Sequence, residues 1–272
     1  MGRSTDHRST SSLEITLTNA VELSFLPRSR CFSRRALARL LCGALLSTGC
    51  ASYPTVPQED RANLVRELTS KRRDKFLRLS FYVMPFFGDP SKKLLATVPP
   101  EEVSLVKQPS GEPMNPGPVE AILPAGTRVQ ITKVEFPTAV VLSERPLNTP
   151  RALPWIYLRG GNRDGAPLIL VLKADILSQE EFVAELERYL SDADLTPLLS
   201  SWSDVVQLAV RTKTAIIDMS GEALEMAWGY PDRKEISFVD SVRNEEWIYG
   251  KRRRAYLAEG RVVQRETGKE EP

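Results

Sequence analysis

The residues best suited to chemistry lie within the first 50 positions of the chain. All three cysteines (Cys31, Cys42 and Cys50) and the only histidine, His7, are found there. Thiolates and imidazoles are the usual nucleophiles, general bases and soft metal ligands of proteins. Cys50 has the most informative surroundings of the four, because it follows three small residues, Ser47 to Gly49.

A short apolar run precedes these small residues. It extends from Leu40 to Leu46 and follows three arginines, Arg34, Arg35 and Arg39. A positive segment, an apolar core of about 7 residues or more and small residues before a cut mark an export signal. We therefore expect residues 1–49 to be a signal or leader peptide, cleaved between Gly49 and Cys50. A buried amphipathic helix is the alternative, which two glycines inside the segment disfavour.

The residues around Cys50 resemble the lipobox of bacterial lipoproteins, in which a leucine and two small residues precede the cysteine. Here Leu46 lies one position early, and Ser47 takes the usual leucine position. The resemblance implies that Cys50 carries a diacylglycerol and, after cleavage, a further acyl chain such as palmitate on its amine. Acyl chains bind bilayers with about 0.8 kcal/mol per buried CH₂. Because Ala51 follows rather than Asp, the resemblance implies sorting to the periplasmic face of the outer membrane.

The arginine-rich segment leaves the export route open. Residues 33–39 also resemble the twin-arginine export motif, with Leu37 in the usual place of phenylalanine. Paired arginines occur in ordinary signal peptides as well, so both routes stay open.

Removal of the leader would leave a mature chain without histidine and without a free thiol. Such a chain cannot build a Ser-His-Asp or Cys-His site, a thiolate zinc site or a His-ligated metal. The sequence also contains no paired-acid motif, phosphate-binding glycine loop or nucleophile elbow. We therefore expect no enzyme activity, no metal and no cofactor.

The charge distribution disfavours nucleic acid as a partner. The whole chain has 37 Lys and Arg against 35 Asp and Glu. Residues 1–49 hold seven of the basic and three of the acidic residues, which leaves 30 basic and 32 acidic residues after the leader. A nucleic-acid binder would show a clustered basic surplus instead.

The mature chain begins with a tether and a short helix, expected over residues 50–75 with the helix from Asp60 to Arg73. Residues 76–175 predict a β-rich unit, in which apolar and polar residues alternate. Residues 88–118 are rich in Pro and Gly and predict a long loop. Strands are expected at residues 76–83, 127–136, 139–142, 155–158 and 168–172.

This series of short strands, led by Gly126, resembles bacterial SH3-like barrels. Such barrels in envelope proteins bind peptidoglycan or peptides, which the resemblance offers as ligands. Trp155 and Tyr157 either form a binding surface or belong to the core and rim of the barrel.

A helical connector is expected over residues 176–212. Ser178 and Glu181 form a capping box at the start of its first helix. Pro197 is expected to break the chain, and Ser203 to begin a second helix.

Residues 213–267 predict a small α+β unit, followed by a tail at 268–272. Ser220 is placed to cap a helix that Gly229 and Pro231 end. Four antiparallel strands follow, at residues 235–239, 246–249, 254–259 and 262–265. The overall fold class is therefore α+β: an SH3-like unit, a helical connector and a C-terminal helix with an antiparallel meander.

The C-terminal unit resembles the SmpA/OmlA-type outer-membrane lipoproteins. The resemblance rests on Met219 to Leu224, AWGYPDR at 227–233, EEWIYG at 245–250 and AYLAEGRVV at 255–263. Members of that family support assembly of outer-membrane β-barrels or act as inhibitor-like binding modules. The matching residues are structural, and we expect Trp247 to be buried.

The densest positive run is Lys251, Arg252, Arg253 and Arg254. Charges of this kind protect a sheet edge from pairing with another sheet. The alternative is contact with an anionic surface, where each basic residue adds about 1 kcal/mol.

Together these features predict a non-catalytic, lipid-anchored binding or scaffold module in the periplasm, with a role in outer-membrane assembly or maintenance. Its partners would be the membrane and envelope proteins. A peptidoglycan-binding cell-wall module is the alternative.

Overall fold

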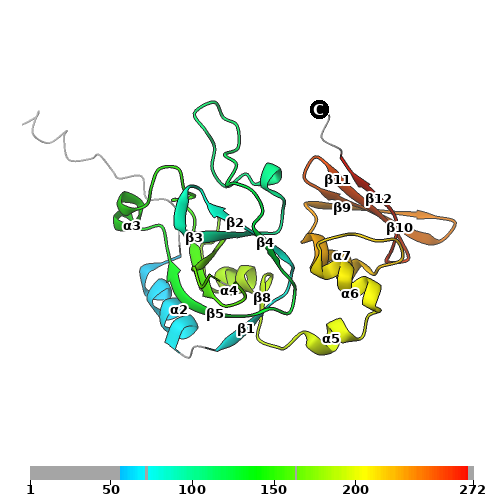
Figure 1. Cartoon of the computed structure of the whole chain (residues 1–272), viewed down its shortest axis with the longest axis horizontal. Helices are drawn as coiled ribbons and strands as arrows, with labels where there is room; N and C mark the ends of the chain where they lie inside the picture. Colours follow the sequence, from blue (N-terminus) through cyan, green and yellow to red (C-terminus); the bar gives the residue numbers. More distant parts are fainter. Residues whose placement is uncertain (1–55, 71–72, 163, 269–272) are drawn as a thin grey trace, which may run out of the picture. The chain divides into compact units, whose positions relative to one another are not determined.

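The computed structural model describes residues 56–70, 73–162 and 164–268 (Figure 1). The described residues all lie within one compact unit, Ser52–Pro272. The expected leader at residues 1–49, the expected cleavage between Gly49 and Cys50 and the expected lipidation of Cys50 all concern positions outside the described residues. None of the helices in the described ranges is long and apolar enough to cross a membrane.

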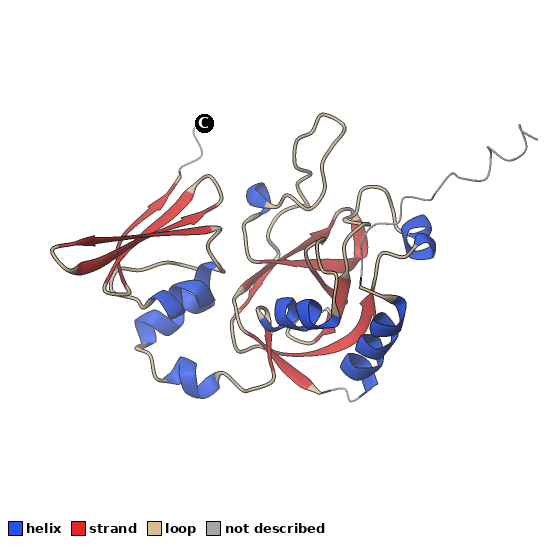
Figure 2. Cartoon of the chain, turned by 180° about the vertical axis from the view of Figure 1, so that it is seen from behind, coloured by secondary structure: helices blue, strands red, loops and turns tan. Residues whose placement is uncertain are grey.

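The larger part of the described chain is a curled sheet of eight strands (Figure 2). Its order is β4-β2-β3-β7-β6-β5-β1-β8, and every pair is antiparallel except the parallel pair β3–β7. The strands are β1 (Asp74–Leu77), β2 (Phe81–Phe86), β3 (Asp89–Ala96), β4 (Ala121–Leu123), β5 (Arg128–Glu135), β6 (Trp155–Arg159), β7 (Leu168–Val171) and β8 (Leu190–Ser191).

Two helices, α2 (Gln58–Ser70) and α4 (Gln179–Glu187), contribute to the main core of this sheet. Leu64 of α2 and Phe182 of α4 are fully buried there, because each lies on the apolar stripe of an otherwise charged helix. One half of the capping box predicted for α4 is confirmed, since the Ser178 hydroxyl accepts a 3.1 Å hydrogen bond from the Glu181 amide. The Glu181 carboxylate accepts from the Leu177 amide instead of completing the box at Ser178.

A separate four-stranded antiparallel meander follows, in the order β12-β11-β10-β9. Its strands are β9 (Arg233–Val239), β10 (Val242–Tyr249), β11 (Arg253–Ala258) and β12 (Arg261–Thr267). A second core joins it to α5 (Thr196–Ser200), α6 (Asp204–Arg211) and α7 (Gly221–Trp228). The coarse α+β prediction, with a C-terminal helix and meander, is therefore confirmed.

The predicted ends of α7 are also confirmed. Ser220 accepts a 3.2 Å hydrogen bond from the Ala223 amide, and Gly229 ends the helix at a φ of 92°. Trp247 is buried, as predicted, and its ring lies against Gly221, where a Cβ would approach Cη2 of the ring to 2.8 Å. Glycine at the start of α7 thus lets the helix approach β10 closely.

Ser80 and Lys213 join the main core of the eight-stranded sheet to the second core, that of the C-terminal meander. The Lys213 amine donates to the carbonyls of Ser80 (2.6 Å) and Ala227 (2.7 Å), and the Ser80 amide donates to the carbonyl of Met226 (2.7 Å). The Ser80 hydroxyl donates to the carbonyl of Val210 at 2.6 Å. The segment between β1 and β2 is thereby fixed to the C-terminal ends of α6 and α7.

Several local predictions were wrong. Residues 88–118 do not form one loop, because Asp89–Ala96 is strand β3, and Pro100–Glu102 is the 3-10 helix η1. Ala139–Glu144 is helix α3 rather than a strand, since the Thr138 hydroxyl caps its first turn. The strand expected at 76–83 is interrupted around Ser80, and Pro197 lies in the first turn of α5 instead of breaking the chain.

The expected connector at 176–212 contributes to both cores. Strand β8 pairs with β1, and Phe182 packs in the core of the eight-stranded sheet. Ala209 and Val210 of α6 pack in the second core, beside α7. The residues of the connector therefore pack both with the eight-stranded sheet and with the C-terminal unit.

Candidate functional site

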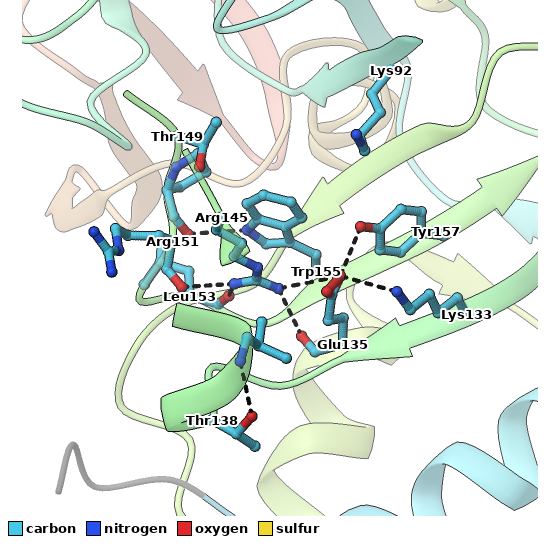
Figure 3. A network of polar contacts seen from close by, with 12 residues as sticks. Lys92, Lys133, Glu135, Thr138, Arg145, Thr149, Arg151, Leu153, Trp155 and Tyr157 are labelled. Carbon is cyan, nitrogen blue, oxygen red and sulfur yellow. Dashed lines mark hydrogen bonds and ion pairs between the residues drawn. The ribbon is translucent and has the colours of Figure 1, made fainter. Parts of the chain in front are cut away.

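Trp155 lies in a third core cluster, together with Phe86 and Ile169, rather than on a binding surface. Its side chain is only 3% exposed and packs edge-on against Phe86, with ring centroids 4.8 Å apart. The indole Nε1 donates to the carbonyl of Pro150 at 3.0 Å, and the Arg145 guanidinium lies 3.6 Å from the ring centroid (Figure 3). The ring is thus buried, with the guanidinium over it and its polar edge hydrogen-bonded, so the surface role considered for Trp155 is corrected to a core role.

The buried Arg145, which sequence reasoning missed, organises this region. Its Nη1 donates to the carbonyls of Arg151 and Leu153, both at 2.7 Å, and its Nη2 to the carbonyl of Glu135 at 3.2 Å. A guanidinium has several donors in a fixed plane, which suits it to hold a loop by its carbonyls. Arg145 therefore fixes residues 145–154 against β5 and β6. No signal in the linear sequence separates it from an ordinary surface arginine.

Tyr157 is half-buried, and its hydroxyl already has a partner. It donates to Oε2 of Glu135 at 2.7 Å, and the Lys133 amine lies 3.4 Å from the same oxygen (Figure 3). Burial, followed by this hydrogen bond to a carboxylate, raises the pKa of Tyr157 well above its ordinary value. The phenol thus stays protonated as a hydrogen-bond donor and is unsuited to act as a base.

Ser80 and Lys213 are close enough to suggest a serine–lysine nucleophile, but their geometry does not support one. The amine binds the backbone carbonyl of Ser80, whereas the Ser80 hydroxyl donates to the carbonyl of Val210 and accepts from the amide of Ala125. Ser80 is fully buried, so no substrate could reach it. An activated nucleophile needs its hydroxyl directed at the base. The pair is structural.

Acidic side chains likewise form no metal site within the described ranges. No group of three or more His, Cys, Asp or Glu side chains converges there. Asp192 pairs with Lys75 at 2.6 Å, and Asp194 accepts hydrogen bonds from the amide and hydroxyl of Thr196 at the start of α5.

The basic run at 251–254 divides into two parts. Arg253 turns inward, where its Nη2 lies 2.9 Å from Oε2 of Glu102 and its guanidinium lies 5.2 Å from the Trp228 ring centroid. Only 10% of its side chain is exposed. The prediction that Arg253 is an interaction residue is therefore corrected, because it forms an internal ion pair instead. Strand alternation explains the division, because Arg253 shares the face of Tyr249 while Arg254 shares that of Ile248.

The other three basic residues lie around a shallow hollow of about 580 Å³ at the end of β11 and β12. Lys251, Arg252 and Arg254 line it together with Arg265, which the prediction had not included. Glu266 is the one acidic residue of its lining. Arg254 also pairs with Glu246 at 3.2 Å, whereas no acidic partner of Lys251, Arg252 or Arg265 is found within the described part of the chain. The hollow therefore presents a net positive surface suited to an anion.

A second hollow, of about 340 Å³, has a different character. It is lined by buried apolar residues, including Phe81 and Leu170, and by two acidic residues, Glu102 and Asp232. Both carboxylates already have partners: Glu102 pairs with Arg253, and Asp232 accepts from the amide of Gly250 at 2.6 Å. Its two carboxylates thus serve the fold, and the basic hollow is the better candidate for a ligand.

Comparison with known proteins adds no relative. The chain matches no protein-family model, no curated protein and no solved structure.

Proposed function

We propose that this chain is a non-catalytic, lipid-anchored binding module of the bacterial envelope, held at the periplasmic face of the outer membrane through Cys50. We further propose that its basic hollow contacts phosphate-bearing anions at that membrane surface. The observation that carries the second part is the meeting of Lys251, Arg252, Arg254 and Arg265 around one hollow.

Electrostatics supports this assignment. Each basic residue near an anionic membrane contributes about 1 kcal/mol, and the contribution falls within a Debye length of the surface. Seven residues separate Cys50 from Gln58, where α2 begins. Such a segment spans at most about 25 Å when fully extended. An anchored domain would therefore stay close to the headgroups, and a local basic surface would suffice despite the slightly acidic balance of residues 50–272.

The two family resemblances support the general part of this proposal, a binding or scaffold role. The helix-plus-meander unit at 213–267 has the element order that the SmpA/OmlA resemblance implies. The antiparallel strands β5, β6 and β7 lie in the segment that resembles SH3-like barrels. Both resemblances are consistent with a binding or scaffold role.

The anchor is tested with Cys50→Ser and metabolic labelling by a fatty-acid analogue. We expect labelling to be lost and the protein to remain soluble or unprocessed. Undiminished labelling of the variant would refute lipidation at Cys50.

The membrane contact is tested on the full chain carrying Cys50→Ser, so that no acyl chain masks it. Binding to vesicles of anionic phospholipid is compared between this chain and a version with Arg252→Gln and Arg265→Gln. Loss of two contacts should weaken binding about 30-fold, since each contributes about 1 kcal/mol. Raising the salt from 0.1 M to 1 M should remove the difference, because the Debye length falls from about 10 Å to about 3 Å.

A matched control removes the same charge elsewhere. Arg159 and Arg211 are exposed and lie outside the hollow, so Arg159→Gln with Arg211→Gln should bind vesicles as the parent does. The leader is the same in all versions and cancels in the comparison. Equal weakening by both pairs would mean that net charge alone matters and would refute the hollow. Retention on purified sacculi, instead of vesicles, would favour the peptidoglycan-binding alternative.

A further inference from the structure

Strand β9 is an edge strand with large apolar side chains in solvent. Each of its residues is exposed, and Ile236 and Phe238 have exposed fractions of 52% and 70%. Within the part of the chain that the structure describes, only β10 pairs with it, so one edge is open (Figure 1). Natural sheets usually guard an open edge, because its unpaired amides and carbonyls are a template for another strand. Exposed apolar residues on such an edge indicate a partner that covers them.

The turn before β10 determines which backbone groups face the open edge. Asp240 and Ser241 have φ values of 49° and 67°, which is the type I′ turn of a two-residue hairpin, and Val239 pairs with Val242 beside it. Hydrogen-bonded and non-hydrogen-bonded pairs alternate from there along an antiparallel ladder. The amides and carbonyls of Lys234, Ile236 and Phe238 therefore point away from β10.

A contact on the other side of β10 supports this assignment of the groups that point away from β10. Arg243 lies opposite Phe238, yet its amide donates to the Glu259 carboxylate and its carbonyl accepts from the Glu259 amide. Its backbone groups thus turn away from β9, as a non-hydrogen-bonded pair requires.

These outward groups match a second copy of the same strand. An antiparallel pair of β9 strands with Ile236 on the two-fold axis places Lys234 opposite Phe238 of the second copy and Ile236 opposite itself. All three outward residues then form hydrogen-bonded pairs, with about six backbone hydrogen bonds in total. No like charges lie directly opposite each other, which would be destabilising.

The two neighbouring registers of the β9–β9 pair, shifted by one residue, are less favourable. An axis at Glu235 would place two carboxylates opposite each other. An axis at Ser237 would leave Lys234 without a strand residue opposite it and would form fewer hydrogen bonds.

The side chains favour the same arrangement. Lys234 lies opposite Trp247, so Lys234, Ile236 and Phe238 share the face on which Trp247 is buried. The Lys234 amine is 2.7 Å from the Glu225 carboxylate and 3.8 Å from the Trp247 ring centroid. With its charge held there, its methylene stem is free to contact Phe238 of the second copy. The two isoleucines and two phenylalanines would then form one apolar strip.

We infer that this protein forms a two-fold symmetric dimer through antiparallel pairing of β9 with β9 of a second copy, centred on Ile236. Closed two-fold dimers are the commonest homo-oligomers. A single strand pair buries less surface than the roughly 1,200 Å² of a stable interface, so the dimer is expected to be weak and concentration-dependent. This inference uses neither the basic hollow nor the lipid anchor.

Cysteine crosslinking tests the axis directly. Ile236→Cys, Glu235→Cys and Ser237→Cys are introduced one at a time into the full chain with Cys31, Cys42 and Cys50 replaced by Ser. The purified proteins are oxidised with copper phenanthroline and run on non-reducing gels. Only residue 236 would bring its two Cα atoms to about 5.5 Å, within disulfide reach, whereas residues 235 and 237 would be about 8 Å apart.

We therefore expect a disulfide-linked dimer with Ile236→Cys and at least about tenfold less with the other two, which exceed the limit of about 7 Å. Leu147→Cys, exposed and distant in sequence, is the control for random collision. Adding Phe238→Ser to Ile236→Cys should reduce the crosslink, and adding Leu147→Ser should not. Crosslinking at 236 no greater than at 147, or a maximum at 235 or 237, would overturn the inference.

A second arm repeats the experiment in bacterial membranes with the native cysteines retained and the unsubstituted chain as the control. Dimer formation there is expected at Ile236→Cys as well. A crosslinked species with another protein in place of the dimer would overturn the inference in favour of a different partner. The first arm lacks Cys50 and so tests the dimer without the lipid anchor. A failure of the anchor would therefore leave the result of the first arm unchanged.

Discussion

Replacing Lys213 with Met tests how the two cores are joined. Lys213 is only 5% exposed, and its amine is the shared donor for the carbonyls of Ser80 and Ala227. Met keeps the straight, apolar stem but removes the amine. Its unbranched stem also suits the left-handed φ of 55° no worse than that of lysine, so backbone strain should change little.

The expected loss can be worked from these contacts. Each buried carbonyl left without a donor costs about 1–3 kcal/mol, which gives about 2–6 kcal/mol for the two. Removal of a desolvated amine returns part of this. We therefore expect the free energy of unfolding to fall by about 2–4 kcal/mol at pH 7.

The pH dependence provides a second, independent check. Burial, with a smaller effect of Arg253, lowers the pKa of Lys213 well below its ordinary value of 10.5. Between the lowered pKa and 10.5 the unfolded chain binds a proton that the folded chain does not, so stability rises with pH across this range. Lys213→Met lacks this rise, and its deficit relative to the parent should therefore grow as the pH approaches 10.5.

Urea unfolding followed by tryptophan fluorescence at several pH values from 7 to 10 measures both effects. Lys173→Met is the control. The Lys173 side chain is 50% exposed, and its amine makes only a long ion pair, 3.8 Å from Oε2 of Glu185. This substitution should change stability by under about 0.5 kcal/mol. A Lys213→Met deficit as small as the control, or one that shrinks as the pH rises, would refute the role assigned to this amine.

Three further changes test the packing. Trp247→Ala should lower the free energy of unfolding by about 3–5 kcal/mol in a urea titration, and an unchanged midpoint would mean that the ring is exposed. Gly221→Ala should lower it by about 1–3 kcal/mol, because the new Cβ would lie 2.8 Å from Trp247, and this loss should shrink in a Trp247→Ala background. Arg145→Met deprives the carbonyls of Arg151 and Leu153 of a donor and should lower it by about 2–6 kcal/mol, with faster amide exchange in residues 145–154; unchanged exchange there would contradict the assigned role.

Much of the C-terminal unit could be predicted from local sequence. Ser220 and Gly229 mark the ends of α7 through their own side chain and backbone freedom, and the meander strands follow from alternation between clear turns. Such signals are contained within a few residues. They need no information about the rest of the chain, which is why these elements were found where expected.

Strand β3 and helix α3 could not be predicted in the same way. Asp89–Ala96 begins in a segment rich in proline and glycine, and it becomes a strand because β2 and β7 offer hydrogen bonds on its two sides. Residues 139–144 are rich in strand-forming residues, yet they form a helix that Thr138 caps and that pairs with no strand. In both cases long-range partners, or their lack, outweighed local preference.

The candidate site shows the same division of information. The sequence alone indicated a cleavable leader, a cysteine suited to lipidation and a dense basic run at 251–254. Tertiary structure decided that Arg253 meets Glu102, 151 positions away along the chain, while Arg265 joins the remaining basic residues around the hollow. It also decided that Trp155 is buried beneath Arg145. Residue type and spacing define what chemistry a segment can do, but charge pairing and burial depend on which distant residues the fold brings into contact.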